Sequence, residues 1–200
     1  MPVDDHSCTL EKYYKLTFYH NIHSEIIELS KAGNSKAQYQ LYQLYAKAMY
    51  NICYRMMNNR EEAEDMLQES FTEAFMNLNS FRFESAFGAW LKRITVNKCI
   101  NALKKRKADL VAVENLPEFP VGKETDEDVP GLTQEQVQKA MENLPEGYRV
   151  VFSLYLLEGY DHGEIAQILG ISEATSKSQY SRAKQRIKEI LINQHHGRQV

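Results

Sequence analysis

Residues 161–190 read DHGEIAQILGISEATSKSQYSRAKQRIKEI, a stretch that predicts two helices joined by a tight turn. Asp161 can cap the first helix, and Glu164 stands three residues later, where it would complete a capping box. Gly170 supplies the left-handed conformation that ends many helices, and Ser172 can cap the helix that follows. This order of helix, glycine turn and helix is typical of the helix-turn-helix, whose second helix enters the major groove of DNA.

The second of these helices carries an excess of positive charge. Between residues 173 and 188 there is one acidic residue and there are five basic ones: Lys177, Arg182, Lys184, Arg186 and Lys188. Basic side chains on such a helix would contact DNA phosphates. The same pattern also fits an amphipathic helical hairpin with a solvated charged face, so this stretch alone leaves both interpretations open.

Charge is segregated along the chain, although the 200 residues include 24 basic and 27 acidic ones and carry a formal net charge of -3. Residues 82–107 hold eight basic side chains and one acidic one, whereas residues 108–131 hold seven acidic side chains and one lysine. A nucleic-acid binder with a negative net charge needs such segregation. The sequence therefore predicts two basic modules separated by an acidic segment.

The composition disfavours several classes of protein. Cys8, Cys53 and Cys99 lie far apart without CxxC spacing, which predicts neither a disulfide framework nor a metal site. His20 and His23 could join Cys8, but a fourth ligand at suitable spacing is missing. No signal peptide opens the chain and no apolar run approaches the roughly 18 residues of a membrane span, so we expect a reducing cytoplasm. Without a glycine-rich phosphate loop or a Ser/Cys–His arrangement, we expect neither an enzyme nor a cofactor or small-molecule substrate.

Sparse glycine (9 residues) and almost no β-branched alternation predict an all-α fold. After a break at residues 33–35, where Ser35 can cap, apolar residues recur at helical spacing as far as Met56. Asn59 is expected to cap the next helix, which has an apolar stripe from Ala63 to Leu78. The opposite face of that helix is polar and acidic, and it contains Asp65, Gln68, Glu69, Thr72 and Glu73.

An aromatic connection and a second basic helix follow. Residues 79–89 (NSFRFESAFGA) place Phe81, Phe83 and Phe87 around Arg82, although loops are normally polar. These rings could fill the core, or they could offer stacking surfaces for unpaired bases. The helix expected over residues 85–107 bears on one face side chains that can hydrogen-bond to bases and phosphates, namely Arg93, Asn97, Asn101 and Lys104.

The C-terminal part is expected to form a separate four-helix module. Residues 109–131 contain three of the five prolines and many acidic residues, which predicts an extended, flexible linker. Helix restarts at Thr133, and Pro145 suits the first position of the next helix, which ends at Gly159. Together with residues 161–190, these two helices would make a module of about sixty residues, enough to fold alone.

Three blocks in this order resemble the extracytoplasmic-function (ECF) group of bacterial RNA polymerase sigma factors. The blocks are EDMLQESFTEAF (64–75), FRFESAFGAWLKRITVNKCINALKKRK (81–107) and LPEGYRVVFSLYLLEGYDHGEIAQILGISEATSKSQYSRAKQRI (144–187), and the resemblance covers about residues 33–192. It implies an N-terminal extension (1–32), sigma region 2 (33–108), a linker (109–131) and sigma region 4 with the helix-turn-helix (132–194). The extension has no assigned function, and its residues 13–29 could form a helix.

The resemblance also implies roles for particular side chains and partners. The residues that would dock on core RNA polymerase are Asp65, Gln68, Glu69 and Thr72. The residues that would contact the minus-ten element, including a base flipped out of the strand, are Phe81, Arg82, Phe83, Ser85, Phe87, Arg93, Asn97, Asn101 and Lys104. The residues that would read the minus-thirty-five element are Ser172, Thr175, Lys177, Ser178, Gln179 and Arg182. The expected partners are core polymerase, promoter DNA as duplex and melted strand, and a regulatory anti-sigma factor.

Three positions depart from the family's usual pattern. Ser176 stands where an apolar residue usually packs, Gln179 where arginine usually meets DNA, and Asn101 where aspartate is common. These departures leave the promoter sequence open. The alternative function is a free-standing helix-turn-helix regulator, but an ordinary sensing or dimerisation domain would not need an aromatic connection beside a second basic helix.

Overall fold

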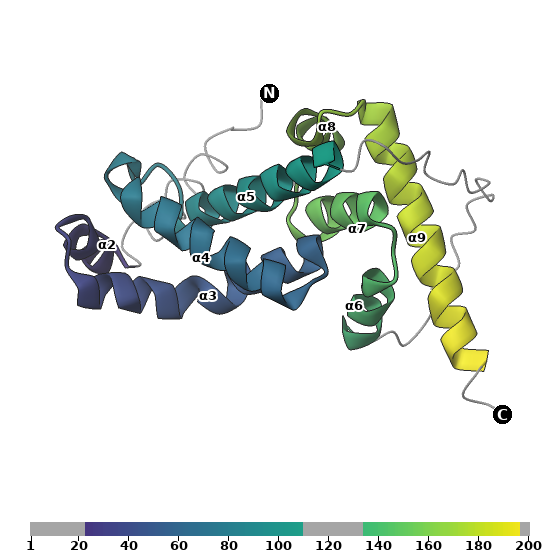
Figure 1. The fold of residues 1–200 in the computed structure, drawn as a ribbon, viewed down its shortest axis with the longest axis horizontal. Coiled ribbons are helices and arrows are strands. Elements are labelled where there is room, and N and C mark those ends of the chain that lie inside the picture. The colour runs from purple at the N-terminus through teal and green to yellow at the C-terminus, as the bar shows by residue number, and fades with distance from the viewer. Residues whose placement is uncertain (1–22, 110–133, 197–200) are drawn as a thin grey trace, which may run out of the picture. The chain divides into compact units, whose positions relative to one another are not determined.

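The computed structural model describes residues 23–109 and 134–196, and this part of the chain contains eight α-helices and no β-strand (Figure 1). The predicted all-α fold is confirmed. The helices before the gap are α2 (Ser24–Lys31), α3 (Ser35–Met57), α4 (Arg60–Met76) and α5 (Phe87–Asp109), with a 3-10 turn, η1 (Leu78–Ser80). Those after it are α6 (Gln134–Glu142), α7 (Glu146–Phe152), a π-helical turn η2 (Ser153–Leu157), α8 (His162–Leu169) and α9 (Glu173–His196).

Two of the expected segments lie largely outside the described residues. The linker predicted over residues 109–131 is one of them, and most of the N-terminal extension is the other. The helix expected over residues 13–29 is described only from Ser24, as α2, and it ends at Lys31.

The chain divides into two units by the density of its internal contacts. The first takes in the residues up to Tyr54 together with Asn59–Cys99, and the second takes in Arg55–Asn58 together with Ile100–Val200. The last turn of α3 and the second half of α5 thus cluster with the C-terminal helices. The domain ranges expected from the sequence, which separate at the linker, stay a prediction.

Aromatic and aliphatic side chains of α3, α4 and α5 form the core of the first unit. The ring of Tyr42 on α3 meets Phe71 on α4 with centroids 4.8 Å apart, and Tyr45 on α3 meets Phe87 on α5 at 5.2 Å. Fully buried residues from the three helices include Leu41, Ala63, Leu91 and Val96. Burial of these apolar groups at helical spacing supplies most of the driving force for packing the three helices.

Side-chain caps fix where α3 and α4 begin. Asn34 Oδ1 accepts hydrogen bonds from the amides of Lys36 (3.0 Å) and Ala37 (3.1 Å), so Asn34 caps α3. The prediction that Ser35 is the cap was wrong by one residue, because Ser35 is already the first residue of the helix. Asn59 caps α4 as predicted, since its Oδ1 accepts the amide of Glu62 at 3.1 Å.

Two buried thiols meet inside the first unit. Cys53 on α3 and Cys99 on α5 are both fully buried and free. A hydrogen bond from the Cys53 side chain, together with burial, raises the pKa of the Cys99 thiol. A protonated, inaccessible thiol is a poor nucleophile and a poor metal ligand, so this pair acts as part of the apolar core.

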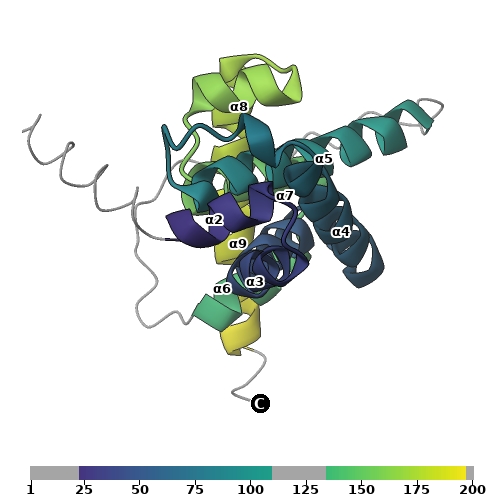
Figure 2. The same cartoon turned by 90° about the vertical axis from the view of Figure 1, so that its left-hand side faces the viewer.

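The core of the second unit is built around the long helix α9, which packs along α6, α7 and α8 (Figures 1 and 2). On α9, Ala183, Ile187 and Leu191 recur every four residues and are buried. They meet a set of buried residues on the preceding helices, Ala140, Met141, Leu144, Tyr148 and Phe152. Pro145 is the N-cap residue of α7 and so lies one position before the first helical residue, where the sequence had predicted it.

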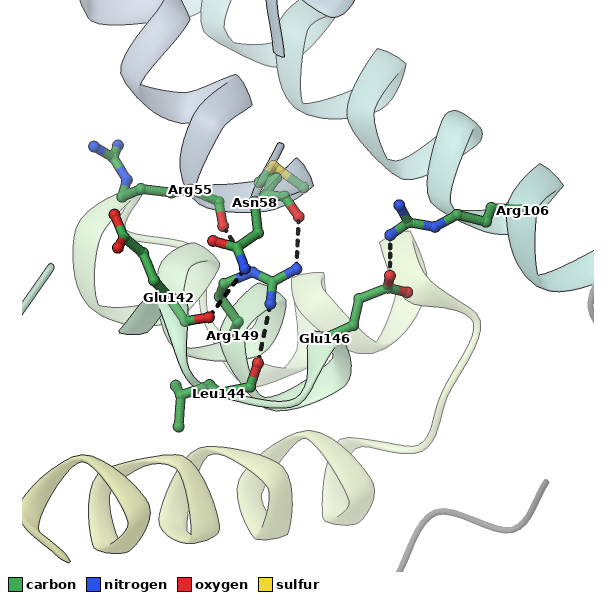
Figure 3. Close-up of polar contacts among 8 residues, drawn as sticks. Arg55, Asn58, Arg106, Glu142, Leu144, Glu146 and Arg149 are labelled. Atoms are coloured by element: carbon green, nitrogen blue, oxygen red, sulfur yellow. Dashed lines mark hydrogen bonds and ion pairs between the residues drawn. The ribbon is translucent and has the colours of Figure 1, made fainter. Parts of the chain in front are cut away.

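A buried arginine joins the end of α3 to α7 within the second unit (Figure 3). Arg149 is only 5% exposed, and its guanidinium donates to the carbonyl oxygens of Arg55 (3.2 Å), Leu144 (3.0 Å) and Met56 (3.5 Å). Burial lowers the pKa of Arg149, but the guanidinium stays charged because arginine starts from a very high pKa.

Three further contacts surround Arg149. They join Asn58 to the Glu142 carbonyl, Arg55 to Glu158, and Arg106 to Glu146. Carbonyl groups that helix ends leave without partners are thereby satisfied.

Candidate nucleic-acid interface

The polar face of α4 is accessible. Asp65, Gln68, Glu69 and Thr72 are all exposed, while Ala63, Met66, Leu67, Phe71 and Ala74 on the other side of the helix are buried. Lys98 on α5 lies beside this face, with its Nζ 2.8 Å from Glu73 and 3.7 Å from Glu69. The hydrogen bond to Glu73 is the main cause of the raised pKa of Lys98. The four predicted docking residues therefore form one exposed surface, in which Glu69 has an intramolecular partner.

The aromatic connection places its three phenylalanines differently. Phe81 and Phe87 are 3% and 4% exposed, and each packs against Trp90, with centroid distances of 5.3 and 5.6 Å. For these two rings the core-filling interpretation is correct, because a buried ring offers no face to a base. Phe81 and Phe87 were expected among the base-contacting residues, and their burial corrects that expectation.

Phe83 and its polar neighbours are the accessible part of this connection. Phe83 is half-buried and has a φ of 59°, which is uncommon for a bulky residue. Its ring lies 4.9 Å from the Phe81 ring and under the Lys31 ammonium, 4.4 Å from Nζ to the ring centroid. Arg82 and Ser85 are exposed. Of the residues in this connection that were expected to contact a base, the accessible ones are therefore Arg82, Phe83 and Ser85.

The polar face predicted for α5 is confirmed as an exposed strip. Arg93, Asn97, Asn101 and Lys104 are all exposed and recur at spacings of four, four and three residues. The helix begins at Phe87, two residues later than expected. Within the second unit, Lys104 Nζ donates to the carbonyl of Ile168 (3.0 Å), which lies in the last turn of α8.

The turn between α8 and α9 has the local geometry that the sequence predicts. Asp161 and Glu164 form a complete capping box, with both hydrogen bonds at 2.8 Å. Gly170 ends α8 in the left-handed region with a φ of 69°. Ser172 Oγ then accepts the amide of Thr175 at 3.0 Å and so caps α9.

The expected reading residues on α9 fall into two groups. Ser172, Lys177 and Ser178 are exposed, and Lys177 pairs with Glu173 at 2.7 Å, a contact that raises the pKa of Lys177. The other three, Thr175, Gln179 and Arg182, are half-buried. The Gln179 amide lies over Gly147 of α7, so that a Cβ at Gly147 would be 3.7 Å from it. This side chain is thus partly engaged within the unit.

Sequence reasoning missed one contact at this site. Ser176 is fully buried, and its hydroxyl lies 2.9 Å from Nδ1 of His162, the first residue of α8. The unusual residue type at position 176 was a signal, but its partner stands 14 residues away. Only the packing of α8 on α9 identifies that partner.

Metal ligation and membrane insertion find no support in the described part of the chain. Among residues 23–109 and 134–196, no group of three or more His, Cys, Asp and Glu side chains could hold a metal ion. Across the same ranges, none of the helices combines the length and the apolar character needed to cross a membrane.

Known proteins share both parts of this architecture. Residues 41–108 match the family model for sigma-70 region 2, and residues 134–187 match that for sigma-70, region 4. The ECF RNA polymerase sigma factor SigM of Mycobacterium tuberculosis is 30% identical over 169 residues, which cover 84% of each chain. SigW of Bacillus subtilis, another ECF sigma factor, is 30% identical over 82% of this chain and 94% of its own.

Among solved structures, the sigma factor RpoE of Bartonella quintana, crystallised with the anti-sigma factor NepR, is similar. The TM-score is 0.50 at 25% sequence identity, over 76% of this chain and 94% of that one. The fold and the two sigma-70 regions define a sigma factor. More specifically, the chain belongs to the ECF group of RNA polymerase sigma factors, and the interpretation as a free-standing regulator is not favoured.

Proposed function

We propose that this sigma factor binds core RNA polymerase, directs it to specific promoters and helps to open the DNA at initiation. The observation that carries the proposal is the match of one chain to both sigma-70 regions in order. Three exposed polar surfaces, on α4, α5 and α9, support it. The protein contributes no reacting group in this scheme, so it acts as a non-catalytic initiation factor, in the cytoplasm where polymerase and promoters are found.

The α4 surface is the proposed site of polymerase docking. Asp65, Gln68, Glu69 and Thr72 present carboxylates, an amide and a hydroxyl, which suits a basic helical partner. Because the surface is exposed, binding it requires little rearrangement of the first unit. Among the described contacts of these four residues, the ion pair between Glu69 and Lys98 would have to loosen.

Charge reversal tests this docking surface. Asp65→Lys with Glu69→Lys should weaken binding to core polymerase by at least about tenfold, because like charges at an interface cost several kcal/mol. Glu25→Lys with Glu28→Lys, on exposed positions of α2 in the same unit, makes the same change in net charge and serves as the control. Equal affinities of the two double variants for core polymerase, measured by competition with wild-type protein, would contradict the assignment.

The minus-ten element is the proposed target of the α5 strip and the accessible part of the aromatic connection. Arg82, Phe83 and Ser85 would hold a base flipped from the strand, and Arg93, Asn97, Asn101 and Lys104 would contact that strand or the adjoining duplex. Flipping a base costs a few kcal/mol, and stacking with polar contacts can offset it. Opening then needs no ATP when these contacts together exceed the cost of unpairing.

The minus-thirty-five element is the proposed target of α9. Ser172, Lys177 and Ser178 are exposed for this purpose, and Thr175, Gln179 and Arg182 flank them. Contacts to phosphates would position the helix, and contacts to base edges would specify the sequence. We also propose an anti-sigma factor as a regulatory partner, on the strength of the similar structure solved with one.

Run-off transcription tests the proposed function as a whole. The full chain should bind promoter duplex weakly on its own and enable purified core polymerase to initiate at defined sites. Transcript starts mapped after overproduction of the protein would supply the promoter templates. Initiation no better than with core polymerase alone would refute the proposal.

A further inference from the structure

The buried hydroxyl of Ser176 has one partner on another helix. Ser176 is the fourth residue of α9 and is fully buried, where an apolar side chain would need no partner. Burying a hydroxyl without a hydrogen bond lowers the stability of the fold, so the group that bonds to Ser176 stabilises the packing of α9. That partner is Nδ1 of His162, 2.9 Å away at the start of α8.

His162 is held in place from three directions. Asp161 and Glu164, which form the capping box of α8, fix its backbone. The His162 ring stacks on Tyr155 of η2 with centroids 4.3 Å apart and planes 13° apart. Its ring also meets Tyr180 of α9 at 5.8 Å and 61°. Nδ1 therefore points at one place on α9, and Ser176 is the residue found there.

Ser176 and Tyr180 are four residues apart and so lie on the same strip of α9. Both touch His162, which gives α9 two attachment points on one ring. Lys177 and Ser178 follow Ser176 by about 100° and 200° around the helix and are exposed. A rotation of α9 by about 20° would move side-chain ends some 5–6 Å from the axis by about 2 Å. A displacement of this size would break a hydrogen bond between a side chain of α9 and a base edge.

We propose that the hydrogen bond between His162 and Ser176 sets the rotation of α9 about its axis, and thereby its preference among minus-thirty-five sequences. The two residues are positioning residues and touch no DNA. The inference rests on the proposed role of α9 in promoter reading. Because a hydroxyl can donate or accept, the contact forms with either tautomer of His162 and also with its protonated form.

Paired variants of His162 separate the hydrogen bond from the ring stacking. His162→Phe keeps a ring over Tyr155 and removes the nitrogen, whereas His162→Asn keeps a polar group near the position of Nδ1 and removes the ring. The exposed Gln167→Ala on α8 is the matched control. Each full-length variant is combined with core polymerase and presented with promoter duplexes that differ by single base pairs in the minus-thirty-five element.

The affinity for an unrelated duplex is measured for each variant. The main readout is the ratio of the affinity for the preferred element to the affinity for its single-base-pair variants. His162→Phe and Ser176→Ala should each lower this ratio about fivefold, the effect of one lost buried hydrogen bond, and leave binding to the unrelated duplex unchanged. His162→Asn should retain the ratio within about twofold. The double variant His162→Phe/Ser176→Val leaves no buried polar group unpaired but also lacks the hydrogen bond, so it should keep the lowered ratio, and a return to the wild-type ratio would overturn the inference.

The outcomes distinguish this inference from the proposed function. A wild-type holoenzyme without any preference among the duplexes would overturn the promoter-reading role of α9, and the inference with it. A wild-type preference that His162→Phe leaves unchanged, or that His162→Asn lowers as much as His162→Phe, would overturn the inference alone. Thermal melting of each variant, followed by circular dichroism, identifies any drop in the affinity ratio that comes from unfolding. If His162→Phe unfolds, the ratio measured for Ser176→Ala, the smallest change, decides whether the inference stands.

Discussion

The aromatic connection at residues 81–87 and the turn at residues 161–175 both present polar groups proposed to meet DNA, but different forces hold them. In the turn, the capping box, the left-handed Gly170 and the Ser172 cap all act between residues no more than five apart. In the connection, Phe81 and Phe87 are fixed by rings on α5 and α3, among them Tyr45. The first region is specified locally, whereas the second depends on the assembled core.

The largest expected effect is at Phe81. Phe81→Ala removes a ring that is 3% exposed and should destabilise the first unit by about 3–5 kcal/mol through lost burial and a cavity. The single tryptophan, Trp90, lies 5.3 Å from Phe81, so its fluorescence reports denaturant unfolding of this unit. Arg82→Ala, at the exposed neighbouring position, should stay within about 0.5 kcal/mol of the wild type. Similar unfolding midpoints for both variants would show that the core does not hold the connection.

A smaller effect is expected at the glycine of the turn. Gly170→Ala places a side chain at a φ of 69°, where nothing lies within 4 Å of the new Cβ, so strain is the only cost. That cost is about 1–2 kcal/mol. Hydrogen exchange of the amides of α8 and the start of α9 measures it, with Gln167→Ala on the exposed side of α8 as the control. Unchanged exchange in Gly170→Ala would mean that local conformation does not limit the stability of the turn.

The smallest effect is expected at the cap of α8. Asp161→Ala removes the side chain that accepts the Glu164 amide and should cost about 1 kcal/mol, whereas Asp161→Ser, which can still cap, should cost a few tenths. Thermal unfolding of the full chain, followed by circular dichroism, compares the two. An equal loss from alanine and serine would argue that Asp161 acts other than as a cap.

Sequence reasoning succeeded where the physical cause lies within a few residues. The Asp161 capping box, the glycine at 170 and the Asn59 cap follow from short-range hydrogen bonds and backbone freedom, and each was predicted correctly. It was less accurate where two residues could play one part, as with Asn34 and Ser35 at the start of α3. The exposed faces of α4 and α5 were also predictable, because helical periodicity separates buried from exposed positions.

Sequence reasoning was less accurate where the burial of a side chain depends on residues distant in the chain. Three phenylalanines in one connection look alike in sequence, but Phe81 and Phe87 enter the core and Phe83 does not. On α9, Gln179 faces Gly147 rather than standing fully free, because α7 packs beside it. Neither result follows from the spacing of residues on one helix.

The sequence by itself determined the all-α fold and the helix-turn-helix, because periodicity and caps act along a single stretch of chain. The sigma-factor family was indicated by the resemblance of three sequence blocks to that family. The tertiary structure decided which aromatic rings are buried and which partner satisfies the hydroxyl of Ser176. Both are contacts between separate helices, and their energies depend on desolvation. Desolvation is a property of the packed core and is fixed only when the helices come together.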